Sequence, residues 1–155
     1  MACKSSNQLE KEVLERSYNL VSKMLRLPAA APALAKMKNM VFKTILYMNK
    51  EFGEELQMNA LRTLHPLCKV QDFRTICYDE HGFPPAVFNG YVKEIQLLFT
   101  KAIGTDGKED AQGLVNTCGS MVAFLGAFPE RLREFEPIIK DLITIVKEKT
   151  ELVRK

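Results

Sequence analysis

The stretch "YDEHGFPPAVFNG", residues 78–90, is the strongest interruption in this 155-residue chain. Gly82 and the Pro84–Pro85 pair do not continue a preceding helix, because proline lacks the amide donor and clashes with the turn before it. Pro85 instead suits the first turn of a new helix, where an amide donor has no partner within the helix. The stretch therefore predicts the end of one helical half of the chain and the start of another.

Helical periodicity continues on both sides of this interruption. Apolar residues recur at spacings of three and four in six segments, as on the buried face of a helix, and no segment alternates apolar and polar residues like a half-buried strand. We predict an all-α fold of about six helices, arranged as an irregular bundle or as stacked helical hairpins. The segments are residues 7–27, 33–50, 56–68, 87–102, 114–125 and 132–153.

Two of these segments carry apolar stripes that we assign to the core. Each stripe follows the helical period, so its side chains lie on one face of the helix. The first comprises Leu9, Val13, Leu20, Met24 and Leu27, and the second comprises Leu114, Cys118, Met121, Val122 and Leu125.

The length and composition are those of a globular protein. A chain of 155 residues, 46% hydrophobic and 26% charged, can bury its own core, so we predict a single domain over residues 1–155 with a short flexible N-terminus, residues 1–6. No apolar run has the length of a membrane span or the form of a signal peptide. Four irregularly spaced cysteines are typical of free thiols in a reducing compartment. We expect a cytoplasmic or nuclear protein.

Both histidines and two of the cysteines lie in "LHPLCKVQDFRTICYDEHG", residues 64–82. His65, Cys68, Cys77 and His81 are residue types that bind tetrahedral Zn²⁺. Their order and the eight-residue gap between the cysteines match no zinc-finger spacing, however. Cys68 follows the core stripe of its helix, and His81 precedes a loop glycine. We predict core and loop residues without a metal, with a zinc site as the alternative.

Signatures of catalysis are missing from the sequence. There is no phosphate-binding glycine loop, dinucleotide fingerprint, nucleophile elbow or H-E-x-x-H motif. Cys77, Asp79 and His81 supply the residue types of a cysteine–histidine pair, but a local loop offers neither the pocket nor the oxyanion donors that acyl transfer needs. We expect no enzyme, no cofactor and no small-molecule substrate.

Charge is distributed unevenly along the chain. Residues 1–50 contain nine Lys or Arg and three Glu, whereas residues 51–128 contain six basic and ten acidic residues. Lysines recur every seven residues in the 33–50 segment, which predicts a basic strip on one helix face. Such a strip is a candidate site for an anion such as nucleic acid or an anionic membrane. The candidate residues are Arg26, Lys36, Lys43, Tyr47 and Lys50.

An all-α chain without a catalytic motif is typical of an interaction module. We predict a protein-binding adaptor or scaffold that offers a groove between helices to another protein, or to a second copy of itself. Leu97 lies nearly opposite the apolar face of its helix and Phe124 leans away from its own, so both are predicted to be exposed partner-binding residues. The alternative is an anion-binding module that uses the basic region 16–50.

Overall fold

A computed structural model of the chain describes residues 5–104 and 109–154. Within these ranges the structure consists of helices and short connections, with no strand, so the all-α prediction is confirmed. That the chain forms a single domain stays a prediction. The α-helices are α1 (Ser6–Met24), α2 (Ala30–Ala35), α3 (Lys38–Tyr47), α4 (Glu54–Cys68), α5 (Phe73–Thr75), α6 (Asn89–Ile103), α7 (Ala111–Ala127) and α8 (Glu136–Arg154).

The first helix begins earlier than the sequence suggested. The Ser5 hydroxyl accepts a hydrogen bond from the Gln8 amide, and the Gln8 side chain accepts one from the Ser5 amide. This reciprocal capping box satisfies amide donors that a helix start otherwise leaves unpaired. Ser6 is therefore part of the helix. That residues 1–6 form a flexible N-terminus stays a prediction, and residues 1–4 lie outside the described part of the chain.

The predicted helix 33–50 is wrong as a continuous element. It is divided among α2, α3 and the short 3₁₀ turn η1 (Lys50–Phe52). Met37 leaves the helical conformation, with φ −87° and ψ 89°. The Ala35 carbonyl, which an amide four residues later would take in a continuous helix, accepts a hydrogen bond of 2.9 Å from Nε2 of His81. A contact from a distant loop thus accompanies the break.

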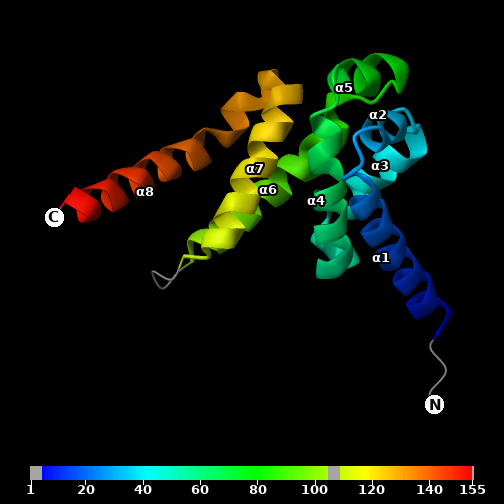
Figure 1. Ribbon diagram of the computed structural model, residues 1–155, viewed down its shortest axis with the longest axis horizontal. Helices are drawn as coiled ribbons and strands as arrows, with labels where there is room; N and C mark the ends of the chain where they lie inside the picture. Colours follow the sequence, from blue (N-terminus) through cyan, green and yellow to red (C-terminus); the bar gives the residue numbers. More distant parts are fainter. Residues whose placement is uncertain (1–4, 105–108, 155) are drawn as a thin grey trace.

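Helix α4 lies at the centre of the molecule. Figure 1 shows α1 and α3 on one side of α4, and α6 and α7 on the other. The contacts agree, since α4 packs against α1, α2, α3 and α7, while α6 pairs with α7. Ala60, Leu64 and Leu67 of α4 are fully buried. The arrangement resembles stacked helical pairs more closely than a compact bundle.

Aromatic rings fill the end of the molecule where the two helical halves meet. Phe88 ends the 3₁₀ turn η3 (Pro85–Phe88), which follows the non-helical residues 81–84. It packs on Phe128 with 4.4 Å between ring centroids, and Tyr91 stacks on Phe124 at the same distance. Phe73, Tyr78 and Phe135 add edge or tilted contacts. Offset and edge-on ring pairs stabilise a core beyond their buried area.

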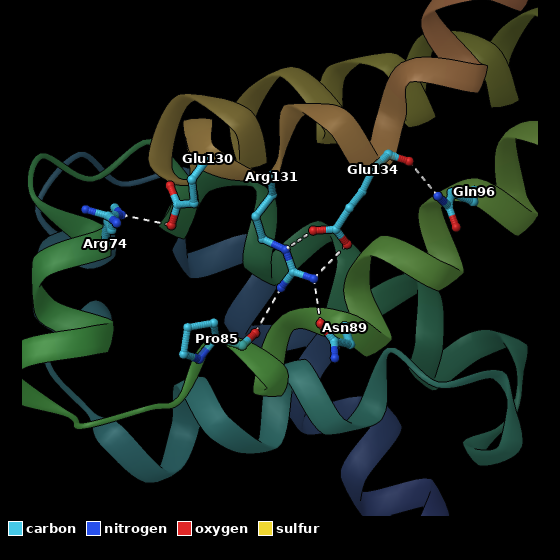
Figure 2. A network of polar contacts seen from close by, with 7 residues as sticks. All are labelled: Arg74, Pro85, Asn89, Gln96, Glu130, Arg131 and Glu134. Atoms are coloured by element: carbon cyan, nitrogen blue, oxygen red, sulfur yellow. Dashed lines mark hydrogen bonds and ion pairs between the residues drawn. The ribbon is translucent and has the colours of Figure 1, made fainter.

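A buried arginine ties the C-terminal part to this core, as Figure 2 shows. The Arg131 side chain is 8% exposed and lies in the 3₁₀ segment η4 (Pro129–Phe135). Its guanidinium donates to the Glu134 carboxylate at 2.7 and 2.8 Å, to the Pro85 carbonyl at 2.9 Å and to the Asn89 side chain. The planar fork of arginine suits several simultaneous acceptors. Arg131 therefore joins η4 to the start of α6.

Helix α8 leaves the rest of the molecule. It contacts the body mainly through η4, and in Figure 1 it diverges from α7 and ends on the side opposite the N-terminus. Ile138 is buried, and Ile139 and Leu142 pack against the core. Further along, Lys149 Nζ lies 3.5 Å from a carboxylate oxygen of Glu109. No helix within the described ranges is both long enough and apolar enough to cross a lipid bilayer.

We expect Arg131→Met to lower the free energy of unfolding by about 2 kcal/mol, because it removes hydrogen bonds to a charged group. Arg133→Met, in the same segment but exposed, is the matched control and should change stability little. Arg131 holds the pKa of Glu134 below its ordinary value of 4.5. The stability from this pair is therefore present above pH 4.5 and is lost as pH falls through the lowered pKa. Chemical denaturation at pH 7 and pH 3 measures the free energy of unfolding of each variant and its dependence on pH. If Arg131→Met and Arg133→Met lowered this free energy equally, Arg131 would have no special role in stability.

Candidate functional site

An open groove of about 940 Å³ lies between α7, the end of α4 and the turn around α5. One wall comes from α7 and the other from residues 65–75, so residues from both helical halves of the chain line the groove. Its lining includes His65, Cys68, Lys69, Phe73, Arg74, Cys118, Gly119, Val122, Ala123 and Gly126.

Small residues form the α7 wall of this groove. A Cβ added to Gly126 would have no neighbouring atom within 4 Å, and one added to Gly119 would lie 3.4 Å from Cε1 of His65. Val122, between them, is 66% exposed. The His65 ring thus occupies the space beside Gly119, whereas at Gly126 the backbone of α7 is open to the approach of another helix.

Helix α7 is turned differently from the sequence prediction. Val122 is exposed, Leu114, Cys118 and Leu125 are only partly buried, and only Met121 of the predicted stripe is buried. The buried face includes two hydroxyl residues that the prediction left outside. Thr117 bonds the Gly113 carbonyl at 2.7 Å, which removes the cost of its burial. The buried residues of α7 are Thr117, Ser120, Met121, Ala123 and Phe124.

Phe124 does not lie on the surface of the molecule. It is fully buried in the aromatic core, in contact with Tyr91, Phe128 and Phe135, so its predicted exposure is wrong. Leu97 is 43% exposed, as predicted. The structure thus separates the two predicted partner-binding residues, and a role of Leu97 in binding stays a prediction.

The four histidine and cysteine residues do not assemble into one site. His65 borders the groove, while Cys68 and Cys77 are buried. His81 precedes a loop glycine, where a solvated histidine is expected from the sequence, but it is also buried, bonded to the Ala35 carbonyl and packed beside the Phe83 ring. That expectation is wrong. The described ranges contain no group of three or more His, Cys, Asp or Glu side chains placed to hold a metal ion. The described residues therefore provide no complete set of ligands for the zinc site that we considered as an alternative.

Burial governs the titration of the groove and its surroundings. Burial raises the pKa of Cys77 to about 12, and it raises the pKa of Cys68 as well, so both thiols are protonated at neutral pH. Burial, and then the charge of Lys69, lower the pKa of His65, which is therefore neutral near pH 7. Burial also raises the pKa of Cys118. None of these thiols has the lowered pKa of a catalytic nucleophile.

The predicted basic strip is not continuous. Arg26, Lys36, Lys43 and Lys50 are all exposed, but Lys36 follows the end of α2, Lys43 lies in α3 and Lys50 begins η1. The seven-residue spacing therefore does not place these lysines on one helix. Tyr47 makes edge-to-face contacts with Tyr18 and Phe52 at 5.6 and 5.1 Å, so its ring belongs to an aromatic cluster.

An apolar surface that the sequence assigned to the core lies on the outside of α1. Helix α1 packs on α4. Its buried residue Tyr18 contacts α3, where its hydroxyl accepts a hydrogen bond from Thr44 and its ring meets Tyr47 edge-on. The apolar residues of α1 span more than half of its circumference, which was the available signal that one side would stay uncovered. The stripe predicted to be buried is exposed at Leu9, Val13, Leu20, Met24 and Leu27.

The chain matches no protein-family model, and neither the curated proteins nor the solved structures include a significant match to it. The interpretation of the groove and of the exposed apolar faces therefore depends on their chemistry alone.

We expect Cys118 to be alkylated before Cys68 and Cys77 in the folded protein. Cys118 is partly exposed at the groove, whereas the other two thiols are buried. The sequence assigned Cys118 to the core, where a thiol would react slowly, so the structure predicts the opposite behaviour for Cys118. A time course with iodoacetamide at pH 8, followed by peptide mass spectrometry on a Cys3→Ser variant, gives the order. Modification of Cys68 or Cys77 at the rate of Cys118 would contradict the burial pattern.

Proposed function

We propose that this chain is a non-enzymatic protein-binding module that accepts a short helix of another protein in the groove between α4 and α7. The observation that carries this proposal is the glycine-lined α7 wall, with Val122 exposed between Gly119 and Gly126. Contiguous exposed apolar surface is the usual mark of an interaction site. A helix lying in an apolar groove is a recurring mode of peptide recognition.

The rim of the groove favours an acidic partner segment. Lys69 is exposed and makes no ion pair with the described residues, whereas Arg74 is already paired with Glu130 at 3.0 Å. Asp72 is the acidic residue of the lining. A helix with apolar residues toward α7 and a carboxylate toward Lys69 therefore complements both features. The charge at the rim would speed association more than it would strengthen the complex.

Gly126→Leu tests the groove directly. The new side chain enters open space and replaces a helical glycine, so the fold should be at least as stable as the wild type. It fills the groove, and we expect the principal protein partner to be lost. Gly90→Leu is the matched control, because it also enters open space but lies on α6 outside the groove.

The measurement is a quantitative comparison of the proteins that the immobilised wild type and the two variants retain from the native cell. A photoreactive group attached to Cys118 should cross-link the same partner that Gly126→Leu loses. Thermal melts establish that both variants fold. Retention of the same proteins by Gly126→Leu and Gly90→Leu would refute the groove as the binding site.

The alternative function, anion binding, is supported by the exposed lysines of the N-terminal half. Lys36, Lys43 and Lys50 make no ion pairs within the described ranges. We expect the Lys36→Glu, Lys43→Glu, Lys50→Glu variant to fold and to keep its protein partner, because these residues lie on the surface and Lys43 and Lys50 are outside the groove. Circular dichroism and titration calorimetry at 50 and 200 mM salt measure folding and binding. Loss of all binding, with a steep salt dependence in the wild type, would favour the anion-binding function.

A further inference from the structure

A second, smaller hollow lies between three helices. It has a volume of about 350 Å³ and is lined by residues of α4, α6 and the N-terminal part of α7. This volume is at the lower end of the range of sites that hold small molecules. We call it the inter-helix pocket, to distinguish it from the groove that we propose for a partner helix.

The apolar part of the inter-helix pocket comes from α4 and α6. Leu61, Ile95 and Ala102 are buried there, whereas Met58 and Leu98 are only partly buried. Met58 and Leu98 therefore keep apolar surface that water covers in the free protein. Because covering such surface with hydrocarbon is favourable, the pocket suits a ligand with an apolar body.

Arg62 brings to this pocket a positive charge that the described residues leave unpaired. It lines the pocket, is exposed and makes no ion pair with any residue of the described ranges. The positions three and four residues away along α4, where a helical ion pair would form, hold no acid. They are occupied by Met58, Asn59, His65 and Pro66. The planar fork of donors on arginine matches the two oxygens of a carboxylate.

The other charged residues of the lining already have partners. Lys101 Nζ lies 3.7 Å from a carboxylate oxygen of Glu54. The Asp110 carboxylate caps α7 by accepting a hydrogen bond of 3.0 Å from the Gly113 amide. The lining thus leaves the charge of Arg62 without a partner while Asp110 stays close by. This arrangement favours a ligand with a single negative charge over a dianion such as phosphate.

We propose that the inter-helix pocket binds a small monocarboxylate with an apolar chain, such as a medium-chain fatty acid. Arg62 holds the carboxylate, and the chain covers Met58 and Leu98. Such a ligand satisfies both the unpaired charge and the accessible apolar surface of the pocket. It binds without reacting, which agrees with a sequence that carries no catalytic motif. The proposal does not depend on the groove function.

His65 gives a spectroscopic signal for the occupation of this pocket. The pocket is lined by α4 up to His65 and by residues 112–120 of α7, whereas the groove begins at His65 and follows residues 118–127. The chain contains two histidines. The other, His81, is buried against the Ala35 carbonyl and lines neither hollow. A ligand in the pocket should therefore change the imidazole signals of His65 and leave those of His81 unchanged.

Titration with octanoate, followed by NMR of the two imidazole rings at pH 8, tests the proposal. We expect the His65 signals to shift in a saturable manner. Arg62→Gln should raise the dissociation constant for octanoate by about tenfold, because it removes charge-assisted hydrogen bonds to the carboxylate. Arg26→Gln, at an exposed position outside the pocket, is the matched control and should leave it unaltered. Octan-1-ol has the same chain without the charge, so it should bind the wild type and Arg62→Gln equally.

A second pair of variants tests the position of the ligand. Asn116 is exposed and lines the pocket, so Asn116→Trp should fill it and abolish the binding of both compounds. Val115→Trp is the matched control, because Val115 is the neighbouring residue, 66% exposed and outside the lining. Gly126→Leu fills the groove instead and should leave octanoate binding intact. Failure of the groove function and failure of this proposal are therefore distinguishable.

Thermal melts establish that each variant folds. His65 signals that stay unchanged at millimolar octanoate would overturn the proposal, and so would His81 signals that shift together with them. The same conclusion would follow if Arg62→Gln or Asn116→Trp bound octanoate as tightly as its control, or if Gly126→Leu abolished the binding.

Discussion

The burial of α4 on nearly every side is the constraint on which the rest of the structure depends. Even its polar residues Gln57, Asn59 and Thr63 are buried. Gln57 donates to the Met48 carbonyl at 3.0 Å and to the Glu94 carboxylate at 2.7 Å, and Thr63 donates to the Asn59 carbonyl at 2.8 Å. Because buried polar groups are costly unless they are bonded, these contacts specify how the end of α3 and helix α6 are placed around α4.

The orientation of α7 follows from this arrangement. It packs against both α4 and α6, so the face that it buries lies between them and includes Phe124. The Tyr91 hydroxyl donates to the Ser120 carbonyl at 2.7 Å, which holds α7 in this rotation against α6. Val115 and Val122 consequently lie outside the core, each 66% exposed. The groove beside Val122 is thus a consequence of the rotation in which α7 packs on α4 and α6.

Helices α1 and α8, the first and last of the chain, lie at the two outer sides of the molecule. Helix α4 and helix α7 each pack against several elements, whereas α1 packs mainly against α4 and α8 mainly against η4. In stacked helical proteins, a terminal helix with an apolar outer side needs a covering partner for solubility. The exposed apolar residues of α1 and α8 lie on the two helices to which this physical requirement applies.

The sequence by itself determined the helical class and an interruption within residues 78–90, because periodicity and proline act locally; the structure confines the non-helical part to residues 81–84. The exposure of Leu97 was also predictable, since it lies opposite the apolar face of its own helix. Only the tertiary structure decided which apolar side of α1 and α7 faces the core, because both helices carry apolar residues over more than one face. It also decided the burial of His81 and the break at Met37, which occur together through the contact with the Ala35 carbonyl. Helical period shows which residues share a face, but the neighbours that cover that face come from distant parts of the chain.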